Sequence, residues 1–297
     1  MSTAVFVNPF TDFGFKKIFG QEASLVSLKG FLNSLLPAHH QIKELSFSKN
    51  EALPREELES KAIFDLLCVS ESGTTFLVEL QKQKQNYFRD RSLYYSSFPI
   101  QEQAKRGDWN FKLHPVYCIG ILDFCFDYAE DEEGQGDIIH TVQLKDQRNK
   151  VFNENLNFIY LEVPNFDKAL GALENAQQRW LYFFKHLDEL DEMPAEFMGE
   201  EAFEAAFESA ALPKMSASEY AAYQQSLKTY RDLKNVIDTA VDEGWDEGHA
   251  VGHAEGLAEG LAEGEARGKA VALEETIQRL VSNGMTEEEA RLLLGVE

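Results

Sequence analysis

Residues 116–122 read VYCIGIL, a run that is apolar from end to end. A strand with one wet face alternates apolar and polar residues, whereas a continuous apolar run is typical of a strand that is covered on both faces. Such strands occur in sheets that carry helices on both sides. The run therefore predicts an α/β protein built around a largely buried strand.

The other periodic segments supply helices and strands in an order that fits this fold class. Apolar periodicity and the signals that start or stop elements predict helices near residues 11–20, 24–36, 86–106 and 180–187, and strands at 61–70, 74–81, 137–144 and 156–163. Pro99 marks a kink or a break in the third helix. The order α-β-β-α-β-β-β predicts a mixed sheet flanked by helices, followed by a C-terminal helical extension.

The C-terminal part of the chain is a repeat. A glycine returns every four residues at Gly244, Gly248, Gly252, Gly256, Gly260, Gly264 and Gly268. Each costs a helix about 1 kcal/mol relative to alanine, so a helix here needs partners or frays. Close packing in a homo-oligomer and a flexible acidic spacer both remain open. We expect a globular domain over residues 1–190, a helical region over 191–240 and a Gly/Ala/Glu repeat tail over 241–297.

The charge is unevenly distributed along the chain. The net charge is −23, which is unfavourable for binding DNA because affinity comes largely from neutralising phosphates. Residues 1–126 hold 14 basic and 14 acidic residues, however, so the whole excess lies in residues 127–297. Residues 82–112 carry seven basic and three acidic side chains. A basic strip for DNA and a solvated helix face are both compatible with this stretch.

Membrane and disulfide signals are weak. No apolar run approaches the roughly eighteen residues of a membrane helix, and the N-terminus lacks the pattern of a signal peptide. We therefore expect a cytoplasmic protein without a membrane partner. Cys68, Cys118 and Cys125 form no CxxC motif, and we expect reduced thiols in the core.

The segment around residues 71–73 predicts a hairpin that brings two acids together. If Glu71, Ser72 and Gly73 form a three-residue loop with Gly73 in the left-handed conformation, Asp65 lies opposite Glu79. A loop of two or four residues would place the acids on opposite faces. Period-two alternation adds further side chains to each face: Lys61 and Gln81 join the acids, and Phe64, Leu66, Phe76, Val78 and Leu80 face the core.

Two facing carboxylates indicate a metal site. Their mutual repulsion is unfavourable in an otherwise apolar hairpin, and a bound cation relieves it. Mg²⁺ takes one or two carboxylates together with water and phosphate oxygens, and it supports hydrolysis of phosphodiesters. The alternative is structural: Asp65 pairs with Lys61 or an arginine, and Glu79 lies at a wet edge.

Several ordered motifs resemble a known family. They are NPFTDFGFKKIFG at 8–20, KAIFD at 61–65, VELQ at 78–81, RSLYY at 91–95 with Gln103 and Gly107, and IGILDF at 119–124. Over residues 6–190 the chain resembles the Rpn family of recombination-promoting nucleases, PD-(D/E)XK nuclease family transposases. The resemblance implies a restriction-endonuclease-like core and DNA cleavage that depends on Mg²⁺, with Mn²⁺ as an alternative. It also implies a link to recombination and to mobile or phage DNA.

The resemblance also implies roles for individual residues. Asp65 and Glu79 become metal ligands, joined by the carbonyl of Leu80. Gln81 stands where the superfamily has a lysine, and a neutral amide supplies no positive charge, so Lys61 is our candidate for that charge. Asp12 belongs to the N-terminal motif, where we interpret it as a helix cap. The candidate DNA contacts are Lys82, Lys84, Arg89, Arg91 and Gln103.

A second function stays open from the sequence. The missing lysine and the acidic tail also fit a weak or inactive nuclease relative that serves as a DNA-binding or oligomeric assembly module. Cleavage of supercoiled plasmid DNA in Mg²⁺, Mn²⁺ or EDTA distinguishes this module from an active endonuclease.

The repeat tail gives the first testable prediction. If the glycine row packs helices of neighbouring chains, deleting the residues after Asp242 will lower the oligomeric state, because short glycine-rich helices do not stand alone. Light scattering on the full chain and the truncated chain measures this directly. Equal numbers of chains in both assemblies would exclude tail-mediated association and favour the spacer.

Overall fold

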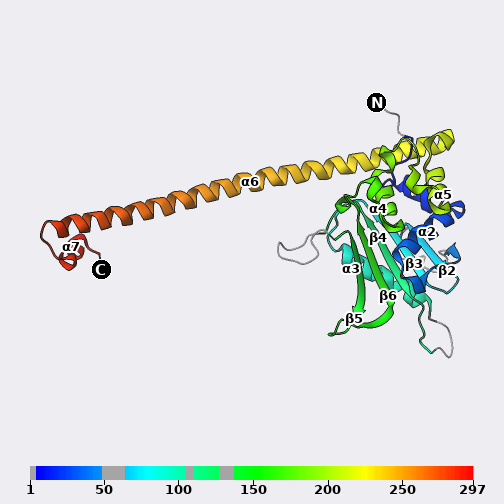
Figure 1. Ribbon diagram of the computed structural model, residues 1–297, viewed down its shortest axis with the longest axis horizontal. Coiled ribbons are helices and arrows are strands. Elements are labelled where there is room, and N and C mark those ends of the chain that lie inside the picture. The colour runs from blue at the N-terminus through cyan, green and yellow to red at the C-terminus, as the bar shows by residue number, and fades with distance from the viewer. Residues whose placement is uncertain (1–4, 49–63, 105–109, 127–136, 297) are drawn as a thin grey trace, which may run out of the picture. The chain divides into compact units, whose positions relative to one another are not determined.

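The computed structural model describes residues 5–48, 64–104, 110–126 and 137–296 (Figure 1). The chain divides into two compact units, Met1–Lys234 and Asn235–Glu297. Among the described residues, every helix is too short or too polar to span a membrane.

The first unit contains a six-stranded mixed sheet. Its strands are β1 (Leu45–Phe47), β2 (Leu66–Ser70), β3 (Thr75–Gln81), β4 (Val116–Leu122), β5 (Ile139–Lys145) and β6 (Val151–Glu162). They lie in the order β1-β2-β3-β4-β6-β5. The central strands β3, β4 and β6 are parallel, and the outer pairings are antiparallel. All seven residues of β4 are buried, which confirms the prediction from their unbroken apolar run. The three-residue strand β1 was not predicted.

Helices cover both faces of the sheet, as predicted (Figure 1). The core cluster on the first face is formed with α1 (Asp12–Phe19), α2 (Leu25–Leu35), α4 (Ala176–His186), α5 (Glu201–Ala210) and the start of α6 (Ala217–Ser282). The opposite face packs against α3 (Phe88–Glu102). Successive side chains of β3 point to opposite faces of the sheet. Phe76 and Val78 join the hydrophobic core on the first face, and Leu77 joins the core under α3. Pro99 lies inside α3 and does not end it.

The core of the first unit continues beyond residue 190. Phe203 of α5 packs on Trp180 with 4.3 Å between ring centroids, and Phe207 packs edge-on against Phe183 at 5.2 Å. Gly30 of α2 lies so close to α5 that an added Cβ would be 2.3 Å from the Cβ of Ala202. Aromatic and small side chains together therefore fix α5 to the helices that cover the sheet.

The cysteines are free thiols, as predicted. Cys68 and Cys118 are buried in the strands, and burial raises the pKa of Cys68 to about 12. Cys125 is half-buried, and its Sγ donates to Asn165 Oδ1 at 3.0 Å.

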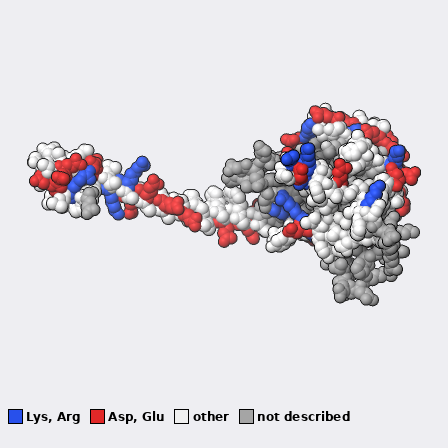
Figure 2. Space-filling model, turned by 90° about the horizontal axis from the view of Figure 1, so that it is seen from below, with Lys and Arg blue, Asp and Glu red and all other residues white. Residues whose placement is uncertain are grey.

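The long helix α6 (Ala217–Ser282) includes the glycine repeat, and α7 (Glu287–Leu294) follows it. Nothing lies within 4 Å of a Cβ added at any glycine of the row. Trp245, Leu257 and Leu261 are 67%, 59% and 62% exposed, and acidic side chains lie along this helix (Figure 2). Packing with another chain would cover these apolar side chains, and this self-association stays a prediction.

The contact between α2 and α5 gives a prediction about stability. Gly30→Ala places a methyl group against Ala202, and we expect the overpacking to outweigh the gain in helix propensity, with a net loss of about 1–2 kcal/mol. Urea unfolding measures the change. Gly171→Ala is the matched control, because nothing lies within 4 Å of its added Cβ. A midpoint for Gly30→Ala at or above that of the control would contradict the tight packing.

Candidate functional site

The β2–β3 hairpin has the register that the sequence predicts. Leu66 pairs with Val78 and Cys68 with Phe76, and the N–H of Ser70 donates to the carbonyl of Thr74 at 2.9 Å. Gly73 has a φ of 84°, in the left-handed region that glycine adopts readily. The three-residue loop is confirmed, and the next positions beyond the Leu66–Val78 pair are those of the two acids.

Asp65 lies in a bend immediately before β2. Its Oδ2 accepts a hydrogen bond from the backbone N–H of Leu80 at 2.7 Å. Burial raises the pKa of Asp65, opposed by this hydrogen bond and by the positive charges of Lys16 and Lys82. The carboxylate is therefore held beside the end of β3 in a setting that penalises its negative charge.

The same bend corrects one expectation about the hairpin faces. Phe64 was predicted to lie on the same core face as Leu66, and this was wrong because the two residues pack into different core clusters. Its ring instead lies 5.2 Å from that of Tyr95 of α3, on the face that carries Leu77. Strict alternation holds only where the chain is extended, and β2 begins at Leu66.

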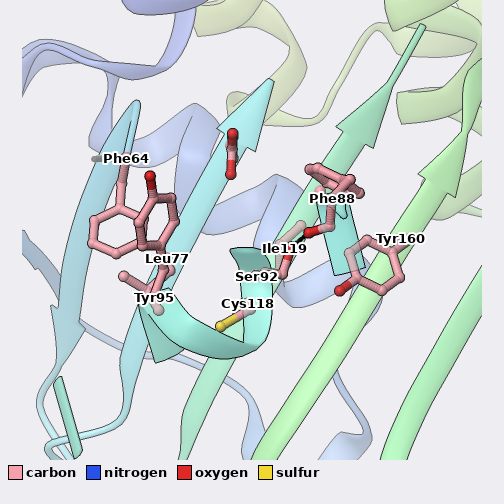
Figure 3. A pocket seen from close by; sticks show the side chains of 10 residues that line it. Phe64, Leu77, Phe88, Ser92, Tyr95, Cys118, Ile119 and Tyr160 are labelled. Carbon is pink, nitrogen blue, oxygen red and sulfur yellow. Dashed lines mark hydrogen bonds between the residues drawn. The ribbon is translucent and has the colours of Figure 1, made fainter. Parts of the chain in front are cut away.

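Glu79 borders a small apolar pocket under α3 (Figure 3). Phe64, Leu77 and Tyr95 group on one side of this pocket, and Phe88 and Tyr160 lie on the other. The cavity measures about 20 Å³, enough for about one water molecule. Burial raises the pKa of Glu79 to about 7, with Arg91 lowering it and Asp65 raising it. The two acids are thus electrostatic neighbours, as the register predicts.

Arg91 of α3 is the cation that contacts Glu79. Its Nη2 donates to Glu79 Oε1 and, at 2.6 Å, to Gln81 Oε1, while Nη1 donates to Gln85 Oε1. The sequence alone placed Arg91 in a basic strip and did not connect it with Glu79. The RSLYY motif was the available signal, but it does not say which side chain Arg91 contacts. Lys61, our candidate for this charge, lies outside the described residues.

Gly120 allows α3 to pack close to this part of the sheet. It pairs with Glu79 in the parallel ladder between β3 and β4. A Cβ at this position would lie 2.9 Å from Tyr160 Cδ1 and 3.4 Å from Phe88 Cζ. The absence of a side chain therefore gives room to the rings that anchor the N-terminal turn of α3, from which Arg91 reaches Glu79.

Lys82 also belongs to the surroundings of Asp65. It is half-buried directly after β3. Burial lowers the pKa of Lys82, and the carboxylates of Asp12 and Asp65 raise it. From the sequence we expected Lys82 to contact DNA, and the structure brings it into the electrostatic environment of Asp65 and Asp12.

Asp12 is not the helix cap that we expected. Thr11 caps α1, and its Oγ1 accepts the N–H of Gly14 at 2.9 Å. Asp12 occupies the first turn and pairs with Lys16, with 3.0 Å between Oδ1 and Nζ. Adjacent Thr and Asp are both good caps, so composition alone does not fix the first residue of the helix.

The other candidate DNA contacts lie around α3. Lys84 and Arg89 are exposed beside its N-terminus, and the Arg89 guanidinium lies 4.4 Å from the centroid of the Phe126 ring. Gln103 follows the C-terminus, where its side chain accepts the N–H of His114 at 2.6 Å and donates to the carbonyl of His114 at 3.2 Å. Lys84 and Arg89 are therefore placed at the surface, whereas Gln103 joins α3 to the segment before β4.

The donor set fits a hard divalent cation. Mg²⁺ keeps several waters and needs only one or two protein carboxylates. Asp65 and Glu79 provide two carboxylates, and burial raises the pKa of both. In the part of the chain that the structure describes, no group of three or more His, Cys, Asp and Glu side chains is arranged to hold a metal. The carbonyl of Leu80 as a further ligand stays a prediction.

Comparison with known proteins identifies a family for this chain. The family described as PD-(D/E)XK nuclease family transposase matches residues 9–240, a range that includes every strand of the sheet and helices α1 to α5. No curated protein and no solved structure matches the chain. The family match covers most of the sequence and confirms the resemblance carried by its motifs. The chain belongs to the PD-(D/E)XK nuclease family transposases.

Proposed function

We propose that this chain is a divalent-metal-dependent DNA endonuclease of recombination or mobile DNA, with Asp65 and Glu79 holding Mg²⁺ or Mn²⁺. The family match supports a nuclease linked to transposition or recombination. The observation that supports the finer proposal is the hairpin register, in which Leu66 pairs with Val78 and the next residue on each strand is one of the two acids. Burial raises the pKa of Glu79 most, and the charge of Asp65 also raises it, as expected for neighbouring carboxylates. We further propose that the protein acts in the cytoplasm as an oligomer formed through its repeat tail.

Each residue of the site has a role that follows from its contacts. A bound metal lowers the pKa of a coordinated water and offsets negative charge on the phosphate. The Leu80 N–H orients the carboxylate of Asp65. Arg91 holds Glu79 and Gln81 in one hydrogen-bonded group. Gln81 in turn donates from Nε2 to the carbonyl of Gln83 at 2.8 Å, which orients its amide.

We assign the positive charge that Gln81 does not supply to Arg91, supported by Lys82. A guanidinium is always protonated and presents several donors, so it binds a carboxylate and a phosphate oxygen at the same time. Arg91 is 28% exposed, which leaves it in contact with solvent where a substrate phosphate would approach. The case for an inactive relative rested on the missing lysine and the acidic tail, and two cations near the acids weaken the first of these arguments.

The first test of this proposal removes each acid. Asp65→Ala and Glu79→Ala should reduce nicking of supercoiled plasmid about a hundredfold or more. EDTA should stop nicking by the wild-type protein. Glu154→Ala is the control, because this exposed acid lies in β6, outside the site. Wild-type rates in either acid variant would remove the pair from the mechanism, and a folded wild-type protein inactive in both Mg²⁺ and Mn²⁺ would favour the binding module.

The second test concerns Arg91. Arg91→Met should slow cleavage about a hundredfold, the typical loss of one charge-stabilising group, while Arg148→Met in the exposed β5–β6 turn should not. Lys61→Met and Lys82→Met in the same assay rank the other cations. If Lys61→Met slows cleavage more than Arg91→Met does, Lys61 rather than Arg91 supplies the positive charge.

Metal binding supplies a readout for Arg91 that is independent of cleavage. A proton on Glu79 competes with the metal, so Mn²⁺ affinity should rise as the pH increases through about 7. Arg91 lowers the pKa of Glu79, and Arg91→Met should therefore move this rise to higher pH. Mn²⁺ titrations across the neutral range measure the shift. An unchanged pH profile would show that Arg91 does not act on Glu79.

A further inference from the structure

Tyr87 is an exposed aromatic residue in an unfavourable backbone conformation. It immediately precedes α3, and its side chain is 79% exposed. Its φ of 62° and ψ of 23° lie in the left-handed region, which bulky residues rarely adopt. Glycine or asparagine would fit this backbone better, so a tyrosine at this position lowers the stability of the fold. Strain of this kind points to a function for the side chain.

The next residue explains why the ring of Tyr87 faces solvent. Phe88 is 4% exposed, and its ring centroid lies 5.7 Å from that of Tyr160 and 6.1 Å from that of Phe124. The anchored Phe88 and the left-handed turn before it turn the neighbouring side chain outward. Tyr87 is therefore a ring on a rigid support, fixed at the start of α3.

A cavity of about 300 Å³ lies beside Tyr87. Its lining is aromatic and polar: Lys84, Gln85, Asn86, Tyr87, Phe88, Arg89, Asp90, Phe124 and Phe126. The two cations outnumber the one acid, and the Arg89 guanidinium stacks over the Phe126 ring. Aromatic faces accept a nucleobase, and cations accept the attached phosphate, so the lining has the chemistry of a nucleotide site.

Two hydrogen-bonded side chains, Gln85 and Arg91, connect this cavity with Glu79. Gln85 lines the cavity, and its Oε1 accepts a hydrogen bond from Nη1 of Arg91. The same guanidinium binds Glu79 and Gln81 through Nη2. A nucleotide in the cavity would thus lie next to the phosphate that Arg91 receives.

We propose that Tyr87 stacks on an unpaired base and that the cavity beside it holds one nucleotide of a DNA strand next to the scissile phosphate. The inference rests on the proposed nuclease function and names its substrate class as single-stranded or locally unpaired DNA. Bases inside a duplex have both faces covered by their neighbours, so only an unpaired base presents a face to Tyr87. A duplex touches this surface through its phosphates alone.

Binding of three labelled DNA probes to the full-length protein in EDTA tests the proposal. The probes are a thymidine strand, a strand of the same length with abasic sugars, and a blunt duplex. Tyr87→Gly removes the ring while glycine keeps the left-handed backbone, and Tyr87→Phe retains the ring. Phe152→Ala is the control, because Phe152 is 81% exposed and lies outside this cavity.

The stacking role predicts a loss confined to one probe. Tyr87→Gly should weaken binding of the thymidine strand about tenfold or more and leave binding of the abasic strand and the duplex unchanged. Tyr87→Phe and Phe152→Ala should bind all probes like the wild type. Wild-type affinity of Tyr87→Gly for the thymidine strand, or an equal loss for all three probes, would overturn the proposal.

Two further results separate this proposal from the nuclease function. If Asp65→Ala nicks plasmid like the wild type, the nuclease mechanism fails, and a selective loss in Tyr87→Gly still supports base stacking. If the wild-type protein binds none of the probes, the stacking role fails. Urea unfolding of Tyr87→Gly should give a midpoint at or above that of the wild type, since glycine relieves the left-handed strain. A lower midpoint would assign the ring to packing and overturn the proposal.

Discussion

The burial of β4 on both faces determines where the groups of the candidate site lie. Seven consecutive buried residues require a layer on each side of the sheet, because burying apolar surface contributes about 25 cal/mol per Å². Helices α1, α2, α4 and α5 and the start of α6 contribute to the core cluster on one side, and α3 covers the other. Gly120 in this strand leaves space for Phe88 and Tyr160, so the start of α3 packs close to the sheet. The first turns of that helix then carry Arg91 to Glu79.

Electrostatics at the end of β3 favours a bound cation. Asp65 receives one neutral donor, the N–H of Leu80, whereas Glu79 receives the guanidinium of Arg91. Burial still raises the pKa of both acids, so these interactions do not fully offset desolvation. A pair of half-buried acids whose charges are incompletely compensated is common at functional sites, because the missing compensation comes from the ligand. Both acids lie within the residues that the nuclease family matches.

Sequence reasoning succeeded where short-range chemistry controls the structure. The loop through Gly73 and the alternation of β3 fixed the hairpin register, because each depends on a few adjacent residues. It failed where an element ends. Alternation assigned Phe64 to the wrong face because the chain bends at Asp65, and helix-cap rules did not distinguish Asp12 from Thr11. At such ends, tertiary hydrogen bonds and packing decide between conformations that are locally similar in energy.

The sequence by itself determined the mixed α/β class, the buried central strand and the register of the hairpin that carries Asp65 and Glu79. These features depend on apolar periodicity and turn geometry, which neighbouring residues encode. The tertiary structure alone decided that Arg91 contacts Glu79 and Gln81, that α5 joins the core, and that Tyr87 faces solvent. The partners of a helical side chain depend on how the helix is rotated about its axis and on its position along the sheet. Both are set by packing between side chains that are far apart in the sequence, such as Phe88 and Tyr160. No local sequence pattern predicts such a contact.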